Sequence, residues 1–171
     1  MTTISTQTLV DSTKRNLTKV VTLMDTNTVA NTVILKAANL SFAMNTTGQV
    51  SNTNPKSFYR TNIKRIFGQA TIKSNGYISL IWSSKTNTDV IVTIGNGIFD
   101  YNFEPMGLAA TIPTQNTDPN SNSTGDILIS VVNAAAAGDA ATIFIDLVKD
   151  ARDYNAGQAY DPAAFNAHGI P

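Results

Sequence analysis

Residues 57–103 constrain the fold most, because they read as four successive β-strands joined by short turns. The alternation of apolar and polar residues predicts strands at Tyr59–Ile72, Tyr77–Ser83, Asp89–Ile94 and Ile98–Phe103. Asn75-Gly76 is typical of a type I′ hairpin, since both central positions of that turn need a positive φ. The only tryptophan, Trp82, alternates with Ile78 and Leu80, so we expect it in the core.

The first of these strands has a helical alternative. Its apolar residues recur at helical spacing, at Tyr59, Ile63, Ile66, Phe67 and Ala70. We favour a strand, because the segment is rich in β-branched residues, has no acidic residue for a first helical turn and contains Gly68. In a strand, Gly68 marks a bulge or a bend where a neighbouring backbone comes close.

The composition of the 171-residue chain favours β-structure in one domain. Charged residues make up only 14%, and Glu104 is the only glutamate, whereas Thr, Asn and Ser are abundant. A surface made polar by Thr and Asn suits strands and turns. Zero formal net charge argues against a protein that coats a polyanion, so no direct nucleic-acid partner is expected. No apolar run reaches the length of a membrane helix, and no membrane partner is expected.

The remaining sequence predicts further strands at Leu17–Leu23, Thr32–Lys36, Asp126–Val132 and Ala141–Val148. In Leu17–Leu23 the apolar residues fall mostly on one face, and the last two segments are expected to pair with each other. Ala37–Met44 fits one or two helical turns, or an irregular loop that fills the core with Leu40, Phe42 and Met44. The polar segment Pro105–Gly125 is long for a compact domain, and such loops are functional or disordered.

These patterns predict an all-β fold, either a β-sandwich or a jelly-roll-like barrel, mostly antiparallel. A single β domain is expected at residues 8–149. Residues 1–7 and 150–171 lack a sustained period, so they are expected to form extended N- and C-terminal arms.

Groups suited to chemistry are scarce. The chain has no cysteine, and a zinc site at its single histidine, His168, would need carboxylates alone to complete it. The acidic residues near the C-terminus, such as Asp150 and Asp153, only faintly follow a calcium-loop pattern. No serine has a histidine partner for nucleophilic catalysis, and no phosphate-binding motif is present. We therefore predict a non-enzymatic protein without catalytic residues, metal or cofactor.

Two groups of residues are candidates for partner binding. Lys56, Arg60 and Lys64, together with Arg65, form the basic cluster of the chain. The cluster binds nucleic acid or docks on an acidic protein surface, or it is a solvated sheet face or edge that charge protects against aggregation, which is the favoured interpretation. In the C-terminal segment, aromatic residues are expected to anchor the arm on a partner, namely Tyr154, Tyr160 and Phe165.

Five segments also carry a resemblance: TLVDSTKR (8–15), PKSFYRTNIKR (55–65), GYISLIW (76–82), GDILIS (125–130) and TIFIDL (142–147). Together they resemble small virion structural proteins of tailed phages, especially of phages that infect cyanobacteria and other marine bacteria. The resemblance spans most of residues 8–150. It rests on the general character of these segments and not on a diagnostic motif, so it carries over no functional residue.

The resemblance implies a virion component that is assembled in the host cytoplasm. The first expectation is a capsid decoration (cement) protein, a homo-oligomer (dimer or trimer) that binds the major capsid protein or other virion proteins. A neck, tail or fibre component is the alternative. A carbohydrate-binding β-sandwich is a further alternative, which would need an exposed aromatic platform.

Overall fold

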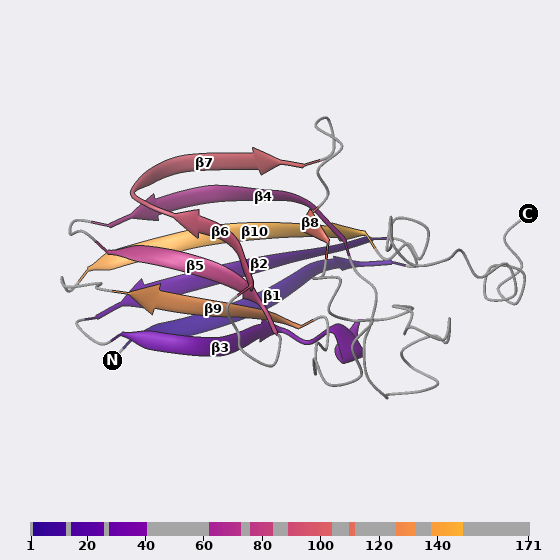
Figure 1. Ribbon diagram of the computed structural model, residues 1–171, viewed down its shortest axis with the longest axis horizontal. Helices are drawn as coiled ribbons and strands as arrows, with labels where there is room; N and C mark the ends of the chain where they lie inside the picture. The colour runs from indigo at the N-terminus through magenta and orange to yellow at the C-terminus, as the bar shows by residue number, and fades with distance from the viewer. Residues whose placement is uncertain are drawn as a thin grey trace, which may run out of the picture.

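The computed structural model describes residues 2–12, 15–25, 28–40, 62–72, 76–83, 89–103, 110–111, 126–132 and 138–148. These residues form an all-β sandwich of two antiparallel sheets (Figure 1). The strands are β1 (Thr3–Asp11), β2 (Arg15–Met24), β3 (Val29–Leu35), β4 (Asn62–Thr71), β5 (Tyr77–Trp82), β6 (Asp89–Ile94), β7 (Gly97–Asn102), β8 (Ala110–Thr111), β9 (Ile127–Val132) and β10 (Asp139–Val148). A 3-10 helix, η1 (Ala37–Asn39), follows β3.

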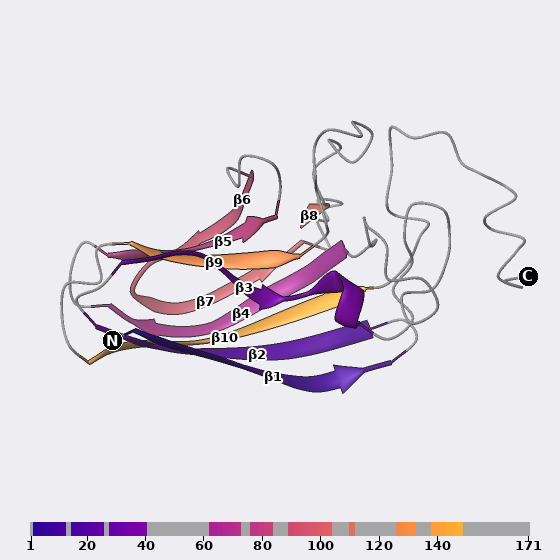
Figure 2. The same ribbon diagram turned by 90° about the horizontal axis from the view of Figure 1, so that it is seen from below.

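The larger sheet has six strands in the order β1-β2-β10-β4-β7, and β8 pairs with β4 beside β7. The smaller sheet has the order β3-β9-β5-β6. Figure 2 shows the two sheets as separate layers, with β9 and β5 over the larger sheet. Every described strand pair is antiparallel.

The core lies between the two sheets and is built from aliphatic side chains. The larger sheet contributes fully buried Ile63, Ile66, Ile143, Ile145 and Leu147, and the smaller sheet contributes Ile78, Leu80, Ile94, Ile127 and Ile129. Complete burial of one such side chain contributes about 1.5–3 kcal/mol. Trp82 is 3% exposed, which confirms its predicted core position.

The predicted strands of residues 57–103 are confirmed within the described residues. The segment with a helical alternative is strand β4, and β5, β6 and β7 match their predicted ranges within one residue at each end. The prediction at Gly68 is also confirmed. A Cβ at Gly68 would lie 2.0 Å from the carbonyl oxygen of Thr142 on β10, so the backbones approach as only glycine allows. The register shift in β4 lies at Lys64 instead, between Ile63 and Arg65.

Two pairing predictions are wrong. The segments before and after Asn75-Gly76 do not form a hairpin, because β4 belongs to the larger sheet and β5 to the smaller one. The predicted pair of β9 with β10 is likewise divided between the sheets: β9 pairs with β3 and β5, and β10 pairs with β2 and β4. The chain crosses repeatedly between layers, which the local alternation of residues cannot reveal.

Strand β2 buries the face opposite to its apolar one. Its buried residues are Asn16, Thr18, Val20, Thr22 and Met24. Leu17 and Val21 are half-buried on the other side, and Leu23 is 59% exposed there. A half-buried strand normally turns its apolar side to the core, so β2 is inverted relative to its sequence pattern.

Other expectations are corrected in part. Thr3–Gln7 pair with β2 as the first half of β1, so the strand begins inside the segment expected to be an arm. Ala37–Met44 contains η1, and Leu40 is buried after it. Ala110–Thr111, inside the loop expected at 105–125, form β8. The segment expected to form the C-terminal arm, 150–171, lies outside the described residues. In the described part of the chain, no helix has the length and apolar character to cross a membrane.

Candidate docking face

The larger sheet has one side that the smaller sheet does not cover, which we call the open face. The strand register defines it, because directly opposite residues in an antiparallel pair lie on the same side. One row across the sheet is Gln7, Lys19, Phe144, Phe67 and Asp100. The row beside it is Ser5, Val21, Thr142, Gln69 and Ile98. On β10 and β4 the neighbours along the strand, Ile143 and Ile66, are fully buried in the core.

An apolar band runs diagonally across the open face. It takes one residue from each of five strands, namely Val10, Leu17, Phe144, Phe67 and Ile98. Val10 lies opposite Leu17, and Phe144 lies opposite Phe67, while the remaining steps are diagonal. Ile98 is 85% exposed at one end of the band. Val21 and the exposed Leu23 add two more apolar residues on β2, where Lys19 separates them from Leu17.

The centre of the band is an aromatic pair. The Phe67 and Phe144 rings stack with centroids 5.0 Å apart and an interplanar angle of 10°. The Arg65 guanidinium lies over Phe67, 4.7 Å from the ring centroid. Stacking and cation–π contacts of this kind each contribute about 0.5–1.5 kcal/mol. They therefore hold the two rings in place on a face that the smaller sheet does not cover.

Two bidentate ion pairs flank the aromatic pair. Arg15 donates from Nε and a terminal nitrogen to the Asp146 carboxylate, at 2.7 Å each. Arg65 donates in the same way to Asp100, at 2.8 and 2.6 Å. The hydrogen bond from Arg65 lowers the pKa of Asp100, and the bonds to the carboxylates raise the pKa of both arginines. Each pair cancels its own charge, so these four residues add no net charge to the open face.

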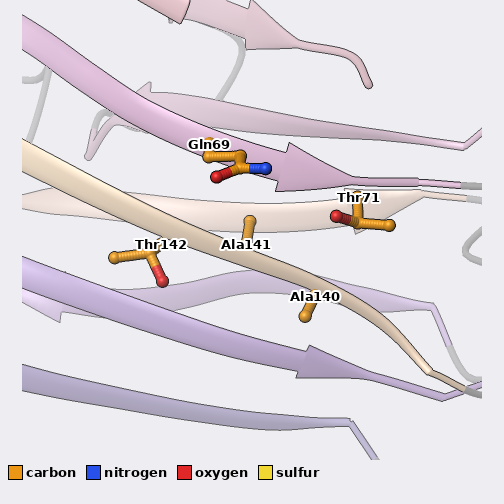
Figure 3. A pocket seen from close by; sticks show the side chains of 5 residues that line it. All are labelled: Gln69, Thr71, Ala140, Ala141 and Thr142. Carbon is orange, nitrogen blue, oxygen red and sulfur yellow. The ribbon is translucent and has the colours of Figure 1, made fainter. Parts of the chain in front are cut away.

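A shallow hollow of about 250 Å³ lies beside the band (Figure 3). Gln69 and Thr71 of β4 and the small residues Ala140–Thr142 of β10 line it. Leu23 lies opposite Ala140 on one side, and Ile98 lies opposite Gln69 on the other. The open face is thus uneven, with a recess between two exposed aliphatic side chains.

Of the sequence-predicted partner residues, Lys64 alone lies within the described residues. Lys64 is half-buried at the bulge in β4, and its carbonyl oxygen accepts a hydrogen bond from the Phe103 N–H at 2.9 Å. Its neighbour Arg65 is paired with Asp100, so this member of the basic cluster is neutralised. The other predicted partner residues lie outside the described residues: Lys56, Arg60, Tyr154, Tyr160 and Phe165.

Sequence reasoning missed the open face. The signal was available in β2, where Leu17, Val21 and Leu23 share one side with Lys19, and Asn16, Thr18 and Thr22 share the other with Val20 and Met24. Only the position of the smaller sheet shows that the apolar side is the uncovered one.

Within the described ranges, no group of three or more His, Cys, Asp or Glu side chains is placed to hold a metal ion. Comparison with known proteins gives no match: no protein-family model, curated protein or solved structure is similar to the chain.

Proposed function

We propose that the protein is a non-enzymatic structural component of a phage virion that decorates the capsid and docks on it through the open face. The observation that carries this proposal is the apolar band on the uncovered side of the larger sheet. Soluble monomers rarely expose large contiguous apolar patches, and those that do usually bind another macromolecule there.

The size of the open face suits a stable protein contact. Four of its strands, about 4.8 Å apart, are about 30–33 Å long and β7 is about 20 Å long, so the face presents roughly 700 Å². A standard protein–protein interface buries about that area on each partner. The face of a sheet is broad, so it needs a broad partner surface, and the protein lattice of a capsid provides one.

The chemistry of the face also suits a protein surface. Phe67, Phe144 and Ile98 offer apolar contact, and the ion pairs of Arg15 and Arg65 offer polar groups without net charge. Buried aromatic residues and arginines are the residues that contribute most at protein interfaces. The hollow beside Ala140 is a place for a partner side chain between Leu23 and Ile98.

The carbohydrate-binding alternative is less well supported. Trp82 is buried, so it offers no platform for a sugar ring. Phe67 and Phe144 turn their ring faces toward each other, and Arg65 lies over one of them. A neck, tail or fibre component would use the same open face, and the experiment below distinguishes it by location.

Co-sedimentation tests the proposal with phage heads and with separated tails that lack the protein. We expect the wild-type protein to sediment with heads, and Ile98→Lys to weaken that binding at least about tenfold, because a charge would be placed in the apolar contact. Val90→Lys is the matched control, since Val90 is 54% exposed but lies on β6 of the smaller sheet.

Equal binding by wild type and Ile98→Lys, or equal loss in Ile98→Lys and Val90→Lys, would contradict docking through the open face. Binding to tails and not to heads would favour the neck, tail or fibre alternative. Specific binding to a glycan array, without binding to either particle fraction, would favour the carbohydrate alternative.

A further inference from the structure

Strand β1 is an edge strand with unusual exposure. It ends the larger sheet and pairs with β2, and no other described strand pairs with it. Along an edge, every second residue directs its N–H and C=O groups away from the sheet. All of Thr3–Asp11 is exposed except the half-buried Ile4, so neither face of the strand is covered over most of its length.

The first six residues of β1 lack the usual protection of an edge. Thr3–Thr8 contain no charge and no proline, and they pair with β2 in unbroken register as far as the shift between Thr8 and Val10. Natural edges are normally blunted by charges, prolines or bulges, because an unprotected edge pairs with other strands.

The other described edges are blunted. β3 has two register shifts against β9, and its Asn31 has a positive φ of 49°. β6 has only six residues and pairs with β5 through a register shift. β7 has six residues and carries Asp100, and β8 has only two residues. The contrast singles out β1 as the edge suited to pairing.

Among the described residues, the smaller sheet leaves most of β1 uncovered. Thr6 and Thr8 lie opposite Val20 and Thr18, which are buried against the smaller sheet. Thr6 and Thr8 point to the same side but are exposed. The smaller sheet therefore does not cover this part of β1.

We propose that β1 pairs antiparallel with β1 of a second copy, across a twofold axis perpendicular to the sheet, so that two six-stranded sheets become one continuous sheet. Identical surfaces meet in such a contact, and it is the commonest closed symmetry of soluble oligomers. Charges in the strand would oppose self-pairing by placing like charges opposite each other. Thr3–Val10 carry no charge, and β-branched Thr and Ile suit strand pairing.

The register of the contact follows from the pleat. Opposite residues in an antiparallel pair must share a face, so one residue must lie directly opposite its own copy, and the twofold axis passes midway between the two. Within the unbroken stretch Thr3–Thr8, the central choices are Ser5 and Thr6. In either register Asp11 lies beyond the paired stretch, so the two Asp11 carboxylates do not meet.

The symmetry has a consequence for the open face. An axis perpendicular to the sheet keeps the open faces of both copies on the same side. The dimer would therefore present two docking faces to one partner surface, and the second contact would form at high effective concentration. The β1 pairing itself does not depend on the proposed function, because it uses a different surface.

Sedimentation equilibrium over a concentration series tests the pairing. We expect a monomer–dimer equilibrium for the wild-type chain, and a dissociation constant at least about tenfold higher for Thr6→Lys, because lysine on an edge opposes strand addition. Thr93→Lys is the matched control, since Thr93 is an exposed threonine on the edge strand β6. Circular dichroism checks that both variants keep the β fold.

Cross-linking provides a second readout that does not depend on a destabilising change. The chain has no cysteine, so a single introduced cysteine forms a disulfide only with another copy. We expect Ser5→Cys or Thr6→Cys to form disulfide-linked dimers under mild oxidation, and Thr93→Cys not to, because only the axial residue meets its own copy at pairing distance.

A wild-type chain that stays monomeric at all concentrations overturns the proposal. So does a dimer that Thr6→Lys leaves unchanged and Ile98→Lys abolishes, since that dimer would be formed by the open face. A monomer whose β1 amides become protected only when a different protein is added would show that the edge takes a foreign strand, which also overturns pairing between copies.

Discussion

Gly68→Ala is the sharpest perturbation of the larger sheet. Gly68 lies in β4, between β10 and β7, and has a φ of +154°. An added Cβ would lie 2.0 Å from the Thr142 carbonyl oxygen and 3.1 Å from Cζ of Phe99. The first contact is with backbone, so relief requires β4 and β10 to separate where they pair.

The expected cost has two parts. A non-glycine residue in a sparsely populated backbone conformation costs about 1–3 kcal/mol. Overpacking of a filled site costs about another 1–3 kcal/mol. The sum, about 2–6 kcal/mol, is a large fraction of the 5–15 kcal/mol by which domains are typically stable. At roughly 2–4 °C per kcal/mol for a chain of this size, the midpoint Tm should fall by about 4–24 °C.

Urea and thermal unfolding measure the cost, with fluorescence of the single buried Trp82 and circular dichroism as probes. Gly95→Ala is the matched control, because a Cβ there meets nothing within 4 Å. A free energy of unfolding for Gly68→Ala within about 0.5 kcal/mol of the Gly95→Ala value would refute the close approach of β4 and β10.

Three further substitutions test the core and the open face. Leu80→Ala should lower the free energy of unfolding by about 2–5 kcal/mol, because Leu80 is fully buried; a loss below about 1 kcal/mol in urea unfolding would place it outside the core. Thr22→Val should raise stability by about 1 kcal/mol, because the buried Thr22 hydroxyl has no hydrogen-bond partner among the described residues; a marked loss would reveal a partner. Asp100→Asn should change how the Tm depends on pH in the acid range, because Arg65 lowers the pKa of Asp100 below its ordinary 3.8. The ion pair stabilises the folded state above pH 3.8 and is lost as pH falls through the lowered pKa, so the Tm difference between wild type and Asp100→Asn should shrink below pH 3.8; a constant difference would contradict the pairing.

Local features of the fold were predictable from the sequence. Alternation located β4–β7, β-branched residues distinguished β4 from a helix, and Gly68 indicated a close backbone approach. These features depend on a few neighbouring residues, so a single sequence contains them. The core position of Trp82 followed in the same way from its alternation with Ile78 and Leu80.

Pairing and the choice of buried face were not predictable. Asn75-Gly76 looks like a hairpin turn, but whether the next strand pairs back or crosses to the other sheet depends on distant partners. The alternation in β2 shows that one side differs from the other, and it does not show which side meets the smaller sheet. The side with Leu17, Val21 and Leu23 was the natural choice for the core, yet it belongs to the open face.

The inverted burial of β2 is the main reason to regard the open face as a binding surface. A sequence that specifies one structure normally has local patterns that agree with the fold, and conflicts concentrate at functional sites. In β2, buried Asn16, Thr18 and Thr22 replace apolar residues, while apolar residues lie uncovered. Burial of the open face against a partner would resolve the conflict.

Side-chain footprinting of the protein, free and bound to phage heads, tests this claim most directly. Hydroxyl radicals oxidise exposed aromatic and aliphatic side chains, so the extent of oxidation measures how exposed each side chain is to solvent. We expect oxidation of Phe67, Phe144 and Ile98 to fall sharply on binding, while Tyr77 on the smaller sheet, 38% exposed in the free chain, is oxidised as before. Unchanged oxidation of all three open-face residues in the head-bound protein would contradict docking through the open face.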